Sequence, residues 1–209
     1  RLKDRLGDAD ENLRGRVFDE RRIVFHQRTA FFAHNASVHN IQPAVVLGFA
    51  SAYAAAGEIG HMVLDARETE VCNCGKRGCV EQYCSATGCV RLAKQQLASS
   101  CEESSLRNIP ELTCRDVFDA GQAGDPLAKQ ILDRYFSLLG EFLASVCCVA
   151  DPEVIVLGGG VSRAGQPLLD GVKRYFAKWG YHACQDTEFR LATLGNDAGA
   201  YGAFKLVAE

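Results

Sequence analysis

Three features that would assign the chain to a familiar class are missing from its sequence. No apolar run reaches the roughly 18–20 residues that a membrane-spanning helix requires. The N-terminus is charged and mixed rather than basic and then apolar, so we expect no secretory leader. Basic residues are not in excess, and a formal net charge of −3 gives no electrostatic reason to expect nucleic acid. These absences predict a soluble, cytoplasmic protein.

Cysteine, by contrast, is abundant, with ten residues in a chain of 209. Disulfide-rich scaffolds are usually short, secreted and poor in helix, whereas this sequence has long helical patterns and no export signal. We therefore expect reduced thiols, some of them metal ligands and the rest small buried apolar groups. Seven cysteines lack ligand spacing and are expected to be structural: Cys84, Cys89, Cys101, Cys114, Cys147, Cys148 and Cys184.

Hydrophobic periodicity predicts an alternation of helices and strands in most of the chain. The segments predicted downstream are helices at 81–97, 113–123, 126–150, 167–179 and 197–207 and strands at 154–157 and 189–194. Thr113 and Asp125 are expected N-caps, and Pro126 suits a first helical position. Upstream the pattern is poor: a helix over 8–25 is expected, and the apolar stretch 45–49 fits a strand or a buried helix. This order of elements indicates an α/β domain.

A dense cysteine pattern stands out in the middle of the sequence. Cys72, Cys74 and Cys79 form C-x-C-x4-C, and Gly75 and Gly78 lie inside this span. Three thiolates are suitable ligands for a tetrahedral zinc ion, and glycines permit the positive φ angles that a tight metal-binding loop needs. The alternative is three free thiols on a turn. We expect a zinc site.

A fourth ligand is needed to complete a tetrahedron. His61 is the only histidine between residues 40 and 181, and Cys84 is the competing candidate. A site closed by four protein ligands leaves no position for water, so this zinc would be structural.

Two acidic residues flank the proposed metal ligands. Glu58 precedes His61 by three residues, and Glu81 follows Cys79 by two. Carboxylates accept several hydrogen bonds, which suits the neighbouring hydroxyls of a sugar, and a loop clamped by a metal would hold them in place. Alternatively, both are acids that begin a helix and interact favourably with its dipole.

These residues together resemble a known family. The stretches "GEIGHMVLD" and "CNCGKRGCVE" look like the signature of the ROK family of repressors, open reading frames and sugar kinases. Three further matches follow in family order: "AGDPLA", "VIVLGGGVSRAG" and "LGNDAGAYGA". The resemblance covers residues 55–209 and is strongest for a glucokinase-like sugar kinase. It leaves residues 1–54 as an unassigned segment unlike the family.

The resemblance implies a fold, a site and a reaction. The fold would be the C-terminal lobe of an actin-like (ribonuclease H-like) ATPase, carrying a zinc-binding loop. His61, Cys72, Cys74 and Cys79 would hold structural Zn²⁺, and Glu58, His61 and Glu81 would contact the sugar. The reaction would be ATP-dependent phosphorylation of a hexose or an N-acetylhexosamine, with Mg²⁺ accompanying the ATP. The family also implies a homodimer.

Gly158, Gly159 and Gly160 follow a predicted strand and lead towards a helix. Glycines there let backbone N–H groups approach a nucleotide, although they are also common in an ordinary tight turn. The spacing is neither that of a Walker loop nor that of a Rossmann fingerprint. The resemblance implies that this loop contacts the adenosine of ATP.

We find no catalytic base in the chain. The family's D-x-G-G-T motif, its N-terminal Asn-Asp pair and its G-T-G-x-G-G hairpin do not occur here. Asp197 matches a separate C-terminal family motif and is expected to cap the last helix. Residues 1–50 are therefore interpreted as a segment translated out of register, or alternatively as part of a divergent protein; the abrupt junction favours the first.

Three functions remain open on the sequence. The first is a ROK sugar kinase of which this chain is one lobe. The second is a remnant that binds sugar and zinc without catalysis, and the third is a sugar-responsive ROK repressor. Only the repressor would bind nucleic acid, and residues 8–30 lack an obvious helix-turn-helix pattern with a basic recognition helix.

Overall fold

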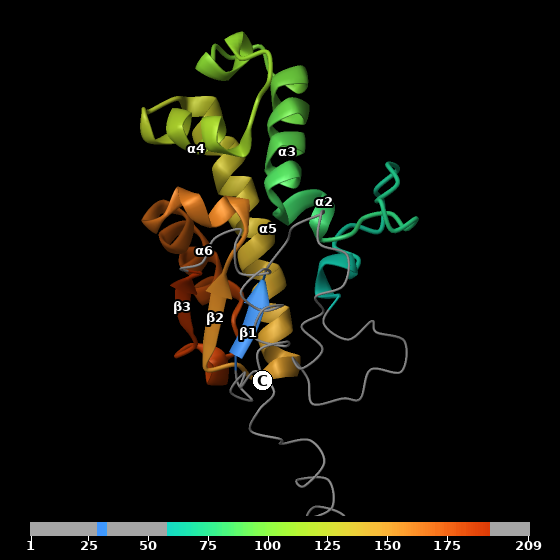
Figure 1. Cartoon of the computed structure of the whole chain (residues 1–209), viewed down its shortest axis with the longest axis vertical. Coiled ribbons are helices and arrows are strands. Elements are labelled where there is room, and N and C mark those ends of the chain that lie inside the picture. The colour runs from blue at the N-terminus through green and yellow to red at the C-terminus, as the bar shows by residue number, and fades with distance from the viewer. Residues whose placement is uncertain (1–28, 33–57, 193–209) are drawn as a thin grey trace, which may run out of the picture.

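The computed structural model of the chain describes residues 58–192 and the backbone of 29–32, and this part is mostly helical with a small parallel sheet (Figure 1). The helices are α2 (Glu81–Cys84), α3 (Ala86–Ser99), α4 (Cys114–Gln122), α5 (Pro126–Ala150) and α6 (Gln166–Trp179), and the strands are β1 (Thr29–Phe32), β2 (Val154–Leu157) and β3 (Glu188–Leu191). Among these helices, none is both long and apolar enough to cross a membrane.

The long helix α5 forms the centre of the described core. Asp125 caps it as predicted, accepting a hydrogen bond from the backbone N–H of Ala128 at 3.0 Å, and Pro126 occupies its first turn. The other Asp125 carboxylate oxygen accepts hydrogen bonds from the hydroxyls of Ser104 and Ser105. Burial opposes ionisation of Asp125, but the hydrogen bonds lower its pKa to about 2. One side chain thus fixes the start of α5 to the connection between α3 and α4.

The helix predicted over 81–97 is interrupted in the structure. It consists of α2 and α3, which are separated by Ser85 in an extended conformation. The Ser85 hydroxyl accepts a hydrogen bond from the N–H of Gly88 and so caps α3. The hydroxyl of Tyr135 in α5 donates to the Cys84 carbonyl at 2.8 Å, satisfying a backbone group that the interruption releases. The prediction of one continuous helix was therefore wrong.

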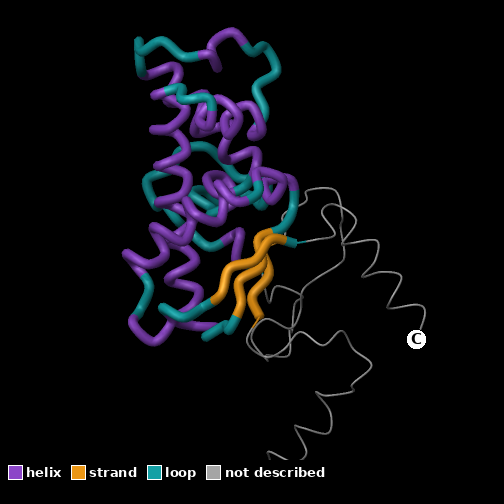
Figure 2. The backbone as a smooth tube through the Cα atoms, turned by 90° about the vertical axis from the view of Figure 1, so that its left-hand side faces the viewer, coloured by secondary structure: helices purple, strands orange, loops and turns teal. Residues whose placement is uncertain are grey.

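The sheet has the order β1-β2-β3, and both strand pairs are parallel. Thr29 is the partner of Val154, and Val154 is the partner of Glu188. The described helices lie on one side of this sheet (Figure 2). The strand predicted at 154–157 is confirmed, whereas β3 spans Glu188–Leu191 rather than 189–194. Strand β1 was not predicted, because its segment shows no clear period-two pattern.

Helices α5 and α6 pack closely because each contributes a glycine to the contact. A Cβ on Gly140 of α5 would lie 2.6 Å from the Cβ of Tyr175 in α6. A Cβ on Gly171 of α6 would lie 2.4 Å from the ring of Phe136 in α5. Neither helix could carry a larger residue there without moving apart.

Of the remaining predictions, some are confirmed and the others fall on residues that the structure does not describe. The helices predicted at 113–123 and 167–179 are present as α4 and α6, and Thr113 forms a capping box with Asp116 at the start of α4. The predictions for 8–25, 45–49 and 197–207, and the role given to Asp197, lie outside the described residues.

Candidate metal centre

The cysteine pattern lies on a tight loop between a 3-10 turn, Ile59–His61, and helix α2; we call residues 62–80 the cysteine loop. The Cys72 N–H donates to the Lys76 carbonyl at 2.7 Å, and the Gly75 N–H donates to the Cys72 carbonyl at 2.8 Å. Gly75 and Gly78 both have positive φ, 85° and 72°, as the sequence predicted. A Cβ on Gly78 would lie 1.9 Å from the Asp65 carbonyl oxygen, so only glycine fits there.

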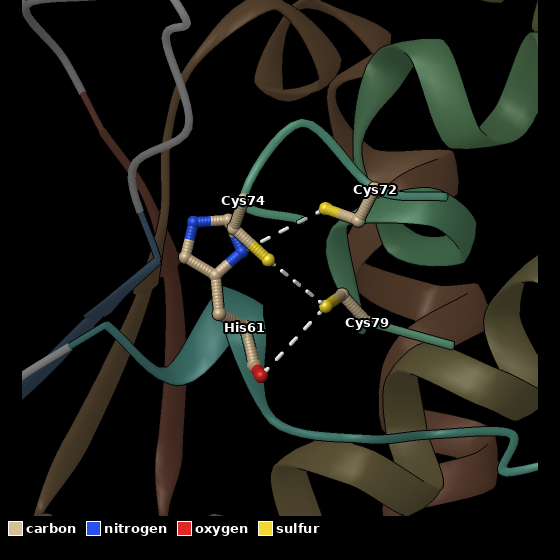
Figure 3. Close-up of side chains that lie close together, drawn as sticks. All are labelled: His61, Cys72, Cys74 and Cys79. Atoms are coloured by element: carbon tan, nitrogen blue, oxygen red, sulfur yellow. Dashed lines mark hydrogen bonds between the residues drawn. The ribbon is translucent and has the colours of Figure 1, made fainter. Parts of the chain in front are cut away.

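This fold brings His61, Cys72, Cys74 and Cys79 together (Figure 3). Their potential ligand atoms all lie within 4.8 Å of one another. The Sγ atoms of Cys74 and Cys79 are 3.6 Å apart, and the Cys72 Sγ is 3.9 Å from His61 Nδ1. A tetrahedral zinc with Zn–S bonds of about 2.3 Å separates two sulfur ligands by about 3.8 Å. The cluster is therefore able to hold a metal ion, and its spacing fits zinc.

The thiol pKa values show what holding such an ion requires. Burial raises the pKa of Cys79 to about 12, and the nearby thiols of Cys74 and Cys72 add to this rise. The pKa of Cys74 is lowered, first by a hydrogen bond from the backbone N–H of Lys76. Thiolates this close repel one another, so a bound cation would stabilise their deprotonated forms.

Cys84, the competing fourth ligand, lies outside this cluster of the described residues. It is buried in the hydrophobic core, and burial raises its thiol pKa. Cys84 is the last residue of α2, and its carbonyl accepts a hydrogen bond from the Tyr135 hydroxyl in α5. Geometry favours His61 as the fourth ligand.

The two predicted carboxylates lie on either side of the His61 imidazole. Glu81 Oε2 is 3.5 Å from His61 Nδ1 and 3.9 Å from the Cys72 Sγ. Glu58 Oε2 is 3.9 Å from His61 Nε2. The Glu58 side chain is 50% exposed and that of Glu81 only 13%, so Glu58 is the more accessible to a dissolved ligand.

A second set of polar residues holds the cysteine loop, and sequence reasoning missed it. Glu68 accepts hydrogen bonds from the Tyr83 hydroxyl and from Arg91 Nη2, both at 2.5 Å. The hydrogen bond from Tyr83 contributes most to a Glu68 pKa lowered to about 2. Arg91 also bonds Glu70 at 2.8 Å, and Gln82 Nε2 donates to the Glu70 carbonyl. These contacts fasten the loop to α2 and α3 without using a metal ligand.

The predicted glycine loop follows β2 and turns into a 3-10 helix, Gly160–Ala164, which packs against α4 and α6. Gly159 has φ 73°, and the Ser162 hydroxyl donates to its carbonyl at 2.7 Å. A Cβ on Gly160 would lie 4.0 Å from the Ala86 Cβ, so this loop approaches the first residue of α3. The structure thus places the glycine loop beside the interruption that follows α2.

Fold and site together define an α/β chain that carries a Cys3His cluster able to hold a metal ion. A family model for the ROK family matches residues 51–209, and the chain belongs to that family. The resemblance recognised from the sequence motifs is thereby confirmed.

Several individual proteins are similar to the chain. The chain is 40% identical over 158 residues to a glucokinase of Halalkalibacterium halodurans, covering 74% of this chain and 48% of that protein. It is 31% identical over 155 residues to the N-acetylgalactosamine kinase AgaK of a Shewanella species, covering 71% and 46%. A solved ROK family glucokinase from Streptomyces griseus, in complex with glucose and AMPPNP, matches with a TM-score of 0.64 and 30% identity, covering 72% and 51%. The chain thus spans about half the length of these relatives.

Proposed function

We propose that the chain is the zinc-bearing, sugar-binding lobe of a glucokinase-like ROK sugar kinase, which phosphorylates a hexose with ATP. Membership of the family and similarity to two sugar kinases support the reaction class. The lobe would have the actin-like ATPase fold, with residues 55–209 forming it. Homodimer formation, which the family implies, stays a prediction.

The metal would be a structural Zn²⁺ held by His61, Cys72, Cys74 and Cys79. Four protein ligands close the coordination sphere, so the ion would fix the loop and take no part in the chemistry. His61 Nδ1 faces the cysteine side of the cluster, which makes it the nitrogen suited to the metal. Nε2 would then carry the imidazole proton.

The sugar would bind at Glu58, His61 and Glu81, and one observation carries this proposal. The same imidazole that points Nδ1 towards the Cys72 Sγ points Nε2 towards Glu58. His61 would therefore bridge the metal and the sugar, donating from Nε2 while the carboxylates accept hydrogen bonds from the hydroxyls. Glucose is the first candidate because a 40% identical relative is a glucokinase.

The nucleotide would be Mg²⁺-ATP, with its adenosine against Gly158–Gly160. The close approach of Gly160 to α3 supports this placement, because it brings the loop near the helices that follow the cysteine loop. The similar Streptomyces griseus glucokinase was solved with AMPPNP, an ATP analogue. We assign no residue of this chain as the catalytic base.

Calorimetry on the purified 209-residue chain tests the proposal. We expect about one zinc per chain and saturable binding of glucose or an N-acetylhexosamine. Glu58→Ala should abolish sugar binding while zinc content is retained, because Glu58 lies beyond the metal ligands. Loss of zinc in Glu58→Ala would instead make Glu58 part of the metal site. A coupled ADP-release assay then separates a catalytic chain from one that only binds.

A further inference from the structure

Lys76 lies at the tip of the cysteine loop and reaches back to the turn before it. Its Nζ donates to the His61 carbonyl at 2.7 Å, across fifteen positions of sequence. His61 ends the 3-10 turn Ile59–His61, whose last carbonyls have no partner within the turn. The lysine therefore caps the segment that carries both Glu58 and His61.

The backbone of Lys76 belongs to the loop that presents the cysteines. Its carbonyl accepts the Cys72 N–H at 2.7 Å. One residue is thus bonded to Cys72 through its main chain and to His61 through its side chain. The Cys79 Sγ also lies 3.8 Å from the His61 carbonyl, but as a metal-bound thiolate it would have no proton to donate. The ammonium group would then be the remaining donor to this carbonyl among the described residues.

Charge favours the same arrangement. A zinc ion with three thiolates and a neutral imidazole carries a net charge of about −1. Lys76 brings a positive charge to the edge of this site, where it stabilises the loaded form. Arg77, next in sequence, has the same charge, yet its side chain makes no hydrogen bond or ion pair within the described part of the chain.

We propose that Lys76 is a positioning residue that couples the metal loop to the sugar-binding turn. It acts through the His61 carbonyl and touches neither metal nor sugar with its side chain. This inference rests on the proposed function. Its specific content is that a hydrogen-bond donor on the side chain at position 76, and not merely a positive charge near the loop, holds Glu58 and His61 in place relative to the cysteines.

The test compares Lys76→Met, Lys76→Arg and Arg77→Met in the full 209-residue chain. Three measurements are made: the rate of zinc release to a chromogenic chelator, the absorption spectrum of the Co²⁺-substituted protein, and the dissociation constant for glucose. Circular dichroism and the melting temperature check that each variant is folded.

We expect Lys76→Met to keep about one zinc per chain, since all four ligands remain. It should release zinc roughly tenfold faster and bind glucose roughly tenfold more weakly than wild type, and a factor of ten corresponds to about 1.4 kcal/mol. The Co²⁺ ligand-field bands should shift as the His61 contribution weakens, while the sulfur-to-cobalt charge-transfer bands remain. Lys76→Arg should recover most of the loss, and Arg77→Met should stay within about twofold of wild type.

The outcomes separate the inference from the function on which it rests. A wild-type chain without zinc would overturn both. A wild-type chain that binds zinc but no sugar would overturn the sugar site, and the release rates and Co²⁺ spectra would still decide the role of Lys76. Equal behaviour of Lys76→Met and Arg77→Met would reject the positioning role alone, because it would reduce the effect to general charge.

Discussion

The hydroxyl of Tyr135 donates a hydrogen bond to the carbonyl of Cys84 at 2.8 Å, joining the middle of α5 to the interruption between α2 and α3. Both groups are buried. Burial raises the pKa of Tyr135 well above its usual value, so the hydroxyl stays a donor. This bond connects the helical core to the segment that follows the metal centre.

Removing that hydroxyl should destabilise the fold. In Tyr135→Phe the buried carbonyl of Cys84 loses its donor, which costs about 2 kcal/mol. The free energy of unfolding from a urea titration measures the loss. Tyr181→Phe serves as the control, because Tyr181 is exposed and should change stability by less than about 0.5 kcal/mol. Equal effects of the two changes would contradict the role of the bond.

Replacing Gly75 and replacing Gly78 should have different effects on zinc binding. Gly78→Ala places a Cβ 1.9 Å from a backbone oxygen and should prevent the loop from closing, with loss of zinc. Gly75→Ala meets no atom within 4 Å and has only a positive φ to overcome, at a cost of about 1 kcal/mol. Zinc content by mass spectrometry distinguishes the two. Retention of zinc in Gly78→Ala would show that the loop can close differently.

The fourth metal ligand can be decided by two substitutions. His61→Ala should lower zinc occupancy strongly, since it removes a member of the cluster. Cys84→Ser should retain about one zinc per chain, while its buried hydroxyl lowers stability by about 1 kcal/mol or more. Zinc analysis after dialysis against a chelator gives the answer. Loss of zinc in Cys84→Ser, with zinc retained in His61→Ala, would exchange the two assignments.

Glu68 should make the free energy of unfolding depend on pH in the acidic range. Its pKa falls from the ordinary 4.5 to about 2 in the folded chain, first because of the Tyr83 hydroxyl and also because of Arg91. A lowered pKa contributes stability that is fully present above pH 4.5 and lost as pH falls through about 2. Glu68→Gln should therefore flatten the decline in unfolding free energy over this window. An unchanged slope would place the acid sensitivity elsewhere, with Asp125 the next candidate.

The sequence predicted those parts of the fold that depend on interactions between residues close together in the chain. Thr113 and Asp125 cap helices as expected, since a cap depends on neighbours within three residues. The three cysteines of the metal cluster could be named because ligand spacing is itself a local signal, whereas the choice of His61 over Cys84 came from the family resemblance. The break at Ser85 was missed although its cap on Gly88 is local, and the Tyr135 hydroxyl that satisfies the freed Cys84 carbonyl comes from far away in sequence. Strand β1 was missed for a related reason, since its pairing with β2 is not local.

The contacts that support the site were the hardest to foresee. Glu68, Tyr83 and Arg91 come from three separate segments, and no spacing rule links them. The hydrogen bond from Lys76 to His61 likewise joins residues that the motif leaves unspecified. In the sequence, a polar residue that donates to a carbonyl or carboxylate far away in the chain cannot be distinguished from any other surface residue.

The fastening of the cysteine loop by Glu68 and Arg91 has a consequence for the lifetime of the protein. These contacts use none of the four metal-cluster residues, so a chain stripped of its ion would keep Glu68 and Glu70 attached to α2 and α3. A new ion would then bind to a loop that is already partly ordered, so its binding would cost less conformational entropy than folding the loop anew. Damage by a chelator would be reversible in such a molecule, and repair would not require making a new chain.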